Sequence, residues 1–273
     1  MRLAIGISTM NDGISLVEKN LESLDGVVDV IICHQITNDK KYNYDGIFNR
    51  SCITVVSKYE KGLSRSRNVL LDTAYDKKYD YLIISDDDVK YKIENLEKLI
   101  IFLSKDENKK NHYQFKSEDE FFNDRKSYRN TSHKLNLLDI FKVSSIEMCL
   151  NVELIKKYNI KFDEKFGLGG VYPVAEEAVL LSDIFRNKQS VIFIPISITI
   201  HPIESTGNKL FINKSMIEAR GAMFRRCAGS AKGILLILLF WIKKFVLRKK
   251  QSNEISTVYS LKLLFEGYLL NGK

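Results

Sequence analysis

Short apolar runs and helix-like segments alternate over residues 1–105, and this alternation limits the possible folds more than any other feature of the chain. Near-continuous apolar strands joined by helical crossovers indicate a mostly parallel sheet with helices on both faces. The sequence therefore predicts an α/β fold. The expected strands are 3–9, 27–33, 53–57 and 81–85, and the expected helices are 14–24, 62–75 and 93–103.

The rest of the chain carries weaker signals. Residues 105–135 are strongly polar and are predicted to form an insertion or surface excursion. A strand is expected over 141–150, and a glycine-containing loop over 163–175. The other expected elements are helices over 152–158, 176–187, 213–226 and 255–270, with strands over 191–194 and 196–201 on either side of Pro195.

Length and composition fit a folded protein. The chain has 273 residues, of which 45% are apolar and 28% charged, so it can bury a large core. None of the four cysteines is paired at CxxC spacing, which argues against a zinc site or a redox motif. No signal peptide is recognised at the start, and together these observations favour a cytoplasmic location.

Polar side chains follow the predicted strands where they end. Ser8 and Thr9 close the first strand, and Asp86, Asp87 and Asp88 follow the fourth. Open α/β sheets bind ligands at the carboxyl ends of their strands. Three adjacent carboxylates repel one another, and a bound Mg²⁺ or Mn²⁺, shared with substrate phosphates, would remove that repulsion. A solvated acidic turn near the helix at 93–103 is the alternative interpretation.

A second signal is the basic stretch 61–68, KGLSRSRN, at the start of a predicted helix. Basic side chains and a helix N-terminus suit a diphosphate. From spacing alone, a solvated helix face explains the stretch equally well.

Residues 62–89, GLSRSRNVLLDTAYDKKYDYLIISDDDV, resemble the donor-binding half of the family 2 glycosyltransferases, which have the GT-A fold. Gly62, Arg67 and Asn68 match that family's Gly-x-x-x-x-Arg-Asn helix, and Asp86 and Asp88 match its DxD motif. The resemblance extends over most of residues 1–205 and is of the bacterial surface-polysaccharide type. It implies a GT-A, Rossmann-like sheet with flanking helices.

The resemblance also assigns residues to the donor and the metal. The donor-binding residues it implies are Ser8, Thr9, Arg67, Asn68, Asp86 and Asp87. The metal ligands it implies, for Mn²⁺ or Mg²⁺, are Asp88, Asp86 and His201. His201 follows the last predicted sheet strand, where the family often places a metal-binding histidine, although a lone histidine at a strand end is more often structural.

Glu176 and Glu177 follow the glycine-containing loop at a predicted helix start. Carboxylates there can serve simply as partners of the helix dipole. In the family resembled, this is the place of a Glu-Asp pair whose second acid is the general base, which makes Glu177 the expected base and Glu176 its neighbour. The chain departs from that pattern with Glu in place of Asp, and with Ala175 where glycine often stands.

The reaction implied is transfer of a sugar, with inversion, from a nucleotide-sugar donor to a saccharide acceptor. A UDP-sugar is the commonest donor in such enzymes, and a lipid-linked saccharide is a common acceptor. Two alternatives stay open: a sugar-nucleotide nucleotidyltransferase, although residues 7–13 lack its basic signature, and a non-catalytic, membrane-attached protein that binds nucleotide sugars.

The net charge of +8 belongs to one C-terminal segment. Residues 219–253 hold nine Lys or Arg and no Asp or Glu, so the rest of the chain has a net charge of −1. A nucleic-acid binder would spread basic residues over its main domain, so no nucleic-acid partner is expected. The apolar run 233–242 is too short to span a membrane, which needs ~20 residues.

A basic, apolar segment of this length predicts a helix that lies on an anionic membrane surface, with Trp241 at the headgroup level. A buried core helix or a dimer contact is the alternative. The expected location is therefore peripheral, on the inner face of the cell membrane. The predicted organisation is a GT-A domain over 1–212, with a nucleotide-sugar half (1–105) and an acceptor half (136–212), and a helical membrane-associating region over 213–273.

Overall fold

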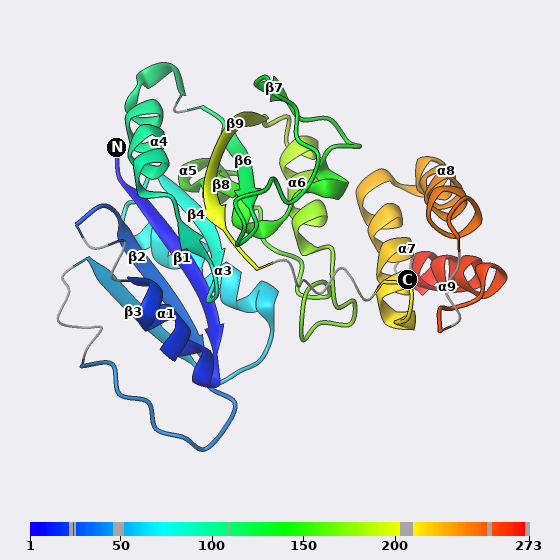
Figure 1. The fold of residues 1–273 in the computed structure, drawn as a ribbon, viewed down its shortest axis with the longest axis horizontal. Coiled ribbons are helices and arrows are strands. Elements are labelled where there is room, and N and C mark those ends of the chain that lie inside the picture. The colour runs from blue at the N-terminus through cyan, green and yellow to red at the C-terminus, as the bar shows by residue number, and fades with distance from the viewer. Residues whose placement is uncertain are drawn as a thin grey trace.

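The computed structural model describes residues 1–21, 24, 26–45, 52–108, 110–202, 210–249 and 253–270 (Figure 1). These residues form a mixed α/β fold built on one nine-stranded sheet. The strands, in sheet order, are β3 (Ile53–Lys58), β2 (Asp29–Gln35), β1 (Leu3–Met10), β4 (Tyr81–Asp86), β8 (Met148–Asn151), β6 (His112–Glu118), β9 (Val191–Ile200) and β5 (Lys90–Tyr91), with β7 (His133–Lys134) also paired to β9.

The sheet has a parallel half and a mixed half. Strands β3, β2, β1 and β4 are parallel neighbours, as the alternation of strands and helices predicts. Beyond β4, the strand β8 is antiparallel to both of its neighbours, while β6 and β9 pair in parallel. The carboxyl ends of β1, β4, β6 and β9 therefore point the same way.

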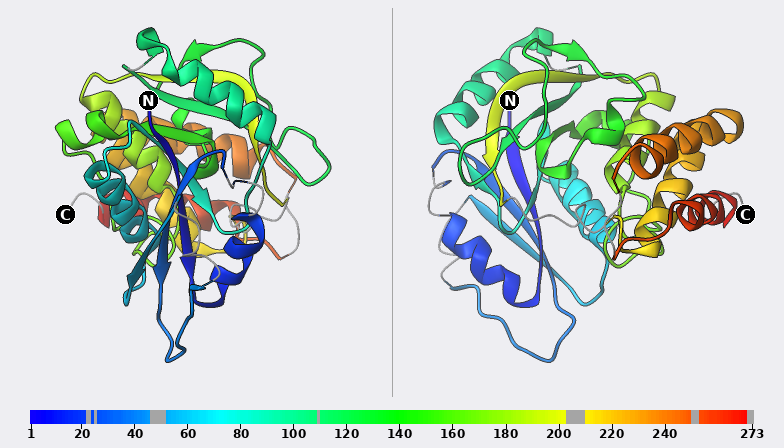
Figure 2. Two further views of the ribbon diagram at one scale, coloured as in Figure 1. Left: turned by 90° about the vertical axis from the view of Figure 1, so that its left-hand side faces the viewer. Right: turned by 45° about the vertical axis from the view of Figure 1, so that its right-hand side comes forward.

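Helices cover both faces of the sheet (Figures 1 and 2). Side chains alternate between the faces of a strand, so Ile5 packs with α1 (Ile14–Leu21) and α4 (Ile93–Ser104), whereas Ala4 packs with the opposite core. That second core contains residues of α3 (Leu63–Asp76), α5 (Val152–Lys157) and α6 (Glu176–Arg186). The central strands β1, β2 and β4 are buried on both faces, which explains why they are mostly apolar, whereas β3 at the edge of the sheet is only partly buried.

Most N-terminal predictions are confirmed within one or two residues. β3, α3, β4 and α4 each end one residue later than predicted, and β2 lies two residues further along the chain. The predicted helix over 14–24 is observed as α1 to Leu21, and residues 22 and 23 lie outside the described part of the chain.

The surface excursion predicted over 105–135 is wrong for its first part. β6 is a buried strand inside the sheet. Two of its polar groups have partners from distant segments: the Gln114 amide donates to Glu147 Oε2 at 2.8 Å, and His112 Nδ1 accepts from Asn151 N at 3.1 Å. His112 Nε2 is buried and has no hydrogen-bond partner among the described residues. A sequence rich in polar residues can thus form a core strand when most of its buried polar groups find partners in other segments.

Two other predictions need correction. The strand expected over 141–150 is reduced to β8, because the 3-10 turns η4 (Ile140–Lys142) and η5 (Ser145–Glu147) precede it. The two strands expected on either side of Pro195 are one continuous strand, β9. The register of β6 against β9 shifts opposite Pro195, so the missing N–H falls at an irregularity of the ladder.

The C-terminal helices form a bundle at the end of the molecule away from β1–β3 (Figures 1 and 2). They are α7 (Lys214–Ala228), α8 (Ser230–Trp241), the π-helical turn η7 (Ile242–Val246) and α9 (Thr257–Leu270). Buried residues of α7 and α9 belong to the same core as α3 and α6. The boundary predicted at 212 therefore marks a change from sheet to helices within one continuous core.

Trp241, which the sequence prediction places at the headgroup level, is held by contacts within the protein. Its ring is partly buried against the core, and its indole N–H donates to Thr257 O at 2.8 Å. The indole N–H that the predicted headgroup contact would use is thus engaged by the backbone of Thr257. Within the described ranges, no helix has the length and apolar character needed to cross a bilayer.

Two glycines set the contact between α7 and α9. A Cβ added at Gly221 would overlap the carbonyl oxygen of Leu264, and one added at Gly267 would overlap that of Glu218. Neither overlap can be relieved by a side-chain rotation, because both obstacles are backbone atoms.

We therefore expect Gly221→Ala to lower the free energy of unfolding by about 3 kcal/mol, the upper range for an overpacked core. The midpoint of urea unfolding measures this. Gly267→Ala should act similarly, and the double variant should lose less than the two single losses together, because both act on one contact. An unchanged midpoint in Gly221→Ala would contradict the close helix crossing.

Candidate active site

A cavity of about 560 Å³ lies at the carboxyl ends of β1, β4 and β9. Its wall includes residues from both halves of the sheet, from α6 and from α7. Of the residues predicted from sequence to form the site, all except Asn68 line it. They are Ser8, Thr9, Arg67, Asp86, Asp87, Asp88, Glu176, Glu177 and His201.

Pairing between β1 and β4 places Ser8 beside Asp86. Ser8 Oγ accepts a hydrogen bond from Ser66 Oγ of α3 at 2.9 Å, which joins the strand end to the helix. Strand β4 ends at Asp86, and the chain turns through Asp87 and Asp88. The carboxyl ends of β1 and β4 and the first turns of α3 thus form one side of the cavity.

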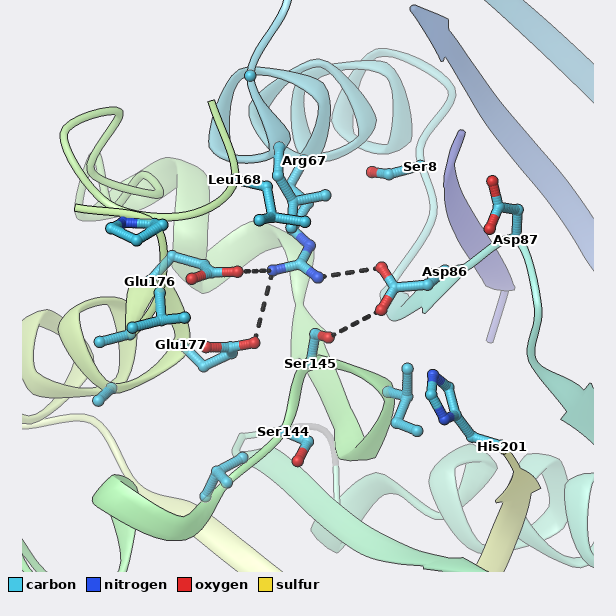
Figure 3. Close-up of a pocket in the computed structure, with 18 of the residues that line it drawn as sticks. Ser8, Arg67, Asp86, Asp87, Ser144, Ser145, Leu168, Glu176, Glu177 and His201 are labelled. Atoms are coloured by element: carbon cyan, nitrogen blue, oxygen red, sulfur yellow. Dashed lines mark hydrogen bonds and ion pairs between the residues drawn. The ribbon is translucent and has the colours of Figure 1, made fainter. Parts of the chain in front are cut away.

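The three aspartates point in different directions. Asp87 Oδ2 accepts from Thr9 Oγ1 at 2.7 Å, and a Cβ on Gly13 would overlap this carboxylate. Burial raises the pKa of Asp87, and repulsion from the adjacent Asp88 adds to that effect. Figure 3 shows Asp87 apart from Asp86, near β1. The repulsion expected of an acidic triplet is therefore reduced by divergence of its side chains.

Arg67 lies at the centre of the site (Figure 3). Its guanidinium donates to Glu176 Oε1 at 2.8 Å and to Asp86 Oδ1 at 3.1 Å, and lies 3.7 Å from Glu177 Oε1. The side chain is 1% exposed. Burial opposes its charge, but the three carboxylates raise the pKa of Arg67 above its ordinary value. Arg67 therefore holds β4 and α6 in place, and its burial argues against extensive contact with a ligand.

Three carboxylates share this one guanidinium, so the cluster carries excess negative charge. The effect falls on Glu176, the most deeply buried of the three. Burial raises the pKa of Glu176 to about 7, repulsion from Glu177 adds to the shift, and attraction to Arg67 opposes it.

The two glutamates at the start of α6 are not equivalent. The Glu176 side chain is 6% exposed and is engaged with Arg67, whereas the Glu177 side chain is 18% exposed on the cavity wall. A general base must reach the proton that it removes. Exposure therefore favours Glu177 over Glu176 for contact with a ligand.

The glycine-containing loop brings the starts of α3 and α6 together. Ser64 Oγ donates to Phe166 O at 2.6 Å. Gly167 has φ of 95°, and a Cβ there would lie 3.2 Å from the Glu176 carboxyl carbon. Ala175, the N-cap of α6, is held at φ of 84°, a left-handed conformation that glycine adopts without strain. Alanine in place of the glycine that is common at this position therefore brings backbone strain.

Asn68 is placed differently from the sequence prediction. Its side-chain amide donates to Phe162 O at 2.9 Å and accepts from Phe162 N at 2.8 Å. Both polar groups are used, and the residue is absent from the cavity wall. This placement argues against donor contact and makes Asn68 an anchor for the segment that leads into the glycine loop.

Asp88 and His201 form a second polar pair across the cavity. His201 Nε2 lies 3.3 Å from Asp88 Oδ1, and His201 Nδ1 contacts Pro202 O at 2.8 Å. Burial opposes protonation, but the Asp88 carboxylate and the Pro202 carbonyl raise the pKa of His201. The hydrogen bond to the Pro202 carbonyl places the proton on Nδ1 and leaves Nε2 free to accept or to bind a cation.

This pair fits two neighbouring positions of an octahedral cation, whose ligands lie at about 2.1 Å and hence about 3 Å from one another. Asp86 fits less well, because Arg67 and Ser145 engage its oxygens at 3.1 and 3.4 Å. Among the residues that the structure describes, no group of three or more His, Cys, Asp or Glu is arranged to hold a metal. A cation at Asp88 and His201 would need further ligands from a substrate and water.

Sequence reasoning missed the turn that carries Ser145. Ser144 and Glu147 form a capping box around η5, and Glu147 also accepts from Gln114, as described above, and from Tyr128 OH at 2.7 Å. Ser144-Ser-Ile-Glu147 has the Ser-x-x-Glu spacing of such a box, so the signal was present in the sequence. The turn presents Ser145 to Asp86 (Figure 3).

Arg220 is a second missed residue. It belongs to α7 yet lines the cavity, and its charge is felt by Glu177 and Glu176. Burial lowers the pKa of Arg220. Its Nε has no hydrogen-bond partner among the described residues. No spacing pattern indicates such a role, because the position of Arg220 depends on the packing of α7 against α6.

Comparison with known proteins supports the fold and goes no further. No family model matches the chain, and no curated protein matches it in sequence. Solved structures of S. aureus TarS do match. TarS 1-349 has a TM-score of 0.64 at 14% identity over 98% of this chain and 81% of that one.

TarS 1-349 in complex with UDP-GlcNAc gives a TM-score of 0.61 at 15% identity, over 98% of this chain and 72% of that one. For another TarS structure the chain covers 43% of the TarS length, at a TM-score of 0.60 and 14% identity. At identities this low, the structural similarity establishes only the architecture, which is GT-A-like.

The buried charge cluster predicts a pH dependence. A pKa of about 7 in the folded state, against 4.5 as the ordinary value, means that the folded protein keeps a proton that the unfolded chain releases. This stabilisation is complete below about pH 4.5 and is lost as the pH rises through 7. Relative to Glu176→Gln, the wild-type free energy of unfolding should fall by about 1–3 kcal/mol across that range.

Urea unfolding at a series of pH values measures the difference in slope. Glu97→Gln, at an exposed glutamate of α4, is the matched control and should follow the wild type. Parallel pH profiles for wild type and Glu176→Gln would contradict the raised pKa.

Proposed function

We propose that the protein is a metal-dependent glycosyltransferase that moves a sugar from a nucleotide-sugar donor to a saccharide acceptor with inversion. One observation carries the proposal. The acidic end of β4 and the two glutamates that begin α6 share one cavity, joined by Arg67, in the same fold as TarS, which has been crystallised with UDP-GlcNAc and with UDP.

The donor is assigned to the β1 and β4 side of the cavity. Ser8, Thr9 and the Asp86–Asp88 turn lie at adjacent strand ends, where α/β sheets bind nucleotides. A UDP-sugar is the proposed donor, by analogy with the TarS complexes. Arg67 acts as a positioning residue here, because its guanidinium is already engaged by protein carboxylates.

Asp88 and His201 are the residues that would hold Mn²⁺ or Mg²⁺, with Asp86 held back by Arg67. When bound, such a cation neutralises negative charge that develops on a leaving nucleoside diphosphate. The contribution of the protein is orientation: Pro202 O holds the His201 ring, and the chain turn after β4 holds Asp88.

Glu177 is the proposed general base. It lies on the α6 side of the cavity, opposite the strand ends, and is accessible. From there its carboxylate removes the proton of an acceptor hydroxyl as that oxygen attacks the anomeric carbon. Attack from the side opposite the leaving group inverts the anomeric configuration. A lipid-linked saccharide of a surface polysaccharide pathway is the proposed acceptor, by analogy.

The first experiment is a donor screen. Nucleotide sugars should raise the melting temperature in the presence of Mn²⁺, and the stabilising donor should then be hydrolysed or transferred. A nucleotidyltransferase would instead consume a nucleoside triphosphate and a sugar phosphate and release diphosphate. A non-catalytic binding protein would be stabilised by the donor yet leave it intact.

Glu177→Gln should lower kcat by about 100- to 10,000-fold, the usual contribution of a general base. The KM for the donor should change little, because Glu177 lies away from the strand ends. Steady-state transfer kinetics with the donor found in the screen test this. Glu177→Asp should retain partial activity, and full activity in Glu177→Gln would refute the assignment.

Asp88→Ala should abolish turnover, and EDTA should do the same to the wild type in a way that added Mn²⁺ reverses. Exposed Asp76→Ala, at the end of α3, serves as the control and should keep wild-type turnover and metal dependence. Full activity with EDTA present would remove the metal from the mechanism.

A further inference from the structure

The C-terminal bundle exposes an apolar stripe on α8 and the turn after it. We call this stripe, with the cations beside it, the α8 face. Its apolar members are between 38% and 76% exposed. They are Ile234, Leu235, Leu238, Leu239, Ile242, Val246 and Leu247.

The opposite side of α8 already has its packing partners. Ile237 is fully buried, Gly233 is buried against α7, and Phe240 and Trp241 pack against the common core. A surface helix normally has one apolar stripe toward the core and a polar stripe toward solvent. The helix α8 is apolar on both, so its outward stripe needs an explanation other than folding.

The charged residues beside the apolar stripe indicate which kind of partner binds it. Lys232, Lys243, Lys244 and Lys249 are exposed, and no acidic residue occurs between Glu218 and Glu254. A second copy of the chain docked on the same face would bring these cations together without counter-charges. An anionic lipid surface satisfies both the apolar stripe and the lysines.

We propose that the α8 face binds the surface of an anionic lipid bilayer, with α8 lying in the plane of the surface. Twelve helical residues span about 18 Å, well short of the ~30 Å hydrocarbon core. The outward leucines and isoleucines enter the headgroup boundary, and Trp241 stays within the protein. This binding does not depend on the proposed enzymatic activity.

The position of α7 connects the α8 face to the cavity. α7 packs against α8 and α9, and it contributes Arg220 to the cavity wall beside Glu177. When the α8 face binds lipid, a single helix, α7, therefore connects the lipid-binding face to the Glu177 side of the cavity.

Co-sedimentation of the full chain with vesicles tests the proposal. Vesicles of phosphatidylcholine mixed with phosphatidylglycerol should retain the protein, and vesicles of phosphatidylcholine alone should retain much less. Raising the salt concentration should weaken the binding. Replacing Lys232, Lys243 and Lys244 together by Gln should weaken it by about 100-fold, at about fivefold for each cation near the surface.

Leu235→Ser with Leu239→Ser removes the apolar contribution, and because both residues are exposed the variant should fold. The matched control is Leu16→Ser with Ile101→Ser, two exposed apolar residues of α1 and α4 at the other end of the molecule, and it should bind like the wild type. Unchanged urea unfolding confirms that both variants are folded.

Three results would overturn the proposal. Wild-type protein could fail to bind anionic vesicles, or both leucine-to-serine variant and control could bind equally well. Alternatively, sedimentation could show a dimer in solution that the Leu235→Ser, Leu239→Ser variant abolishes, which would assign the face to a second copy. Vesicle binding without any donor turnover would leave the membrane proposal standing and contradict only the proposed enzyme.

Discussion

The buried guanidinium of Arg67 is the interaction on which the site depends. A charge that is 1% exposed is costly unless it is paired and hydrogen-bonded, and the close partners of Arg67 come from two other elements. Asp86 ends β4, while Glu176 and Glu177 begin α6, more than 100 residues from Arg67 in sequence. One side chain of α3 thereby fixes the distance between the two acidic groups that the proposed reaction requires.

The sequence predicted the parallel half of the sheet well because burial on both faces leaves an uninterrupted apolar run. It could not predict β6. In the strand HYQFKSE, Tyr113 and Phe115 are buried in the core, while Gln114 pairs with Glu147 and His112 with Asn151. Neither polar pairing is visible from local spacing. At Pro195 the sequence wrongly predicted a break between two strands. The proline is tolerated inside β9 because the register of β6 against β9 shifts there.

Residue types located the site, but burial decided the roles. From the pattern alone, Arg67 and Asn68 are equal candidates for donor contact, and the two glutamates are nearly equivalent. In the fold, Asn68 is used by the Phe162 backbone and Arg67 by carboxylates, which leaves both as positioning residues. Exposure then separates Glu177 from Glu176. These distinctions arise from contacts between segments that are distant in sequence, and such contacts cannot be predicted from a single sequence.

The helix α7 shows why the C-terminal region cannot be treated as a separate anchor. Its buried residues belong to the core beneath the sheet, its glycine contact with α9 is too close for a methyl group, and Arg220 forms part of the cavity wall. If the bundle moved as an independent unit, this wall would open and core contacts would be lost. If the α8 face binds a lipid surface, as proposed, the shared core and the Arg220 contact carry the cavity with the bundle.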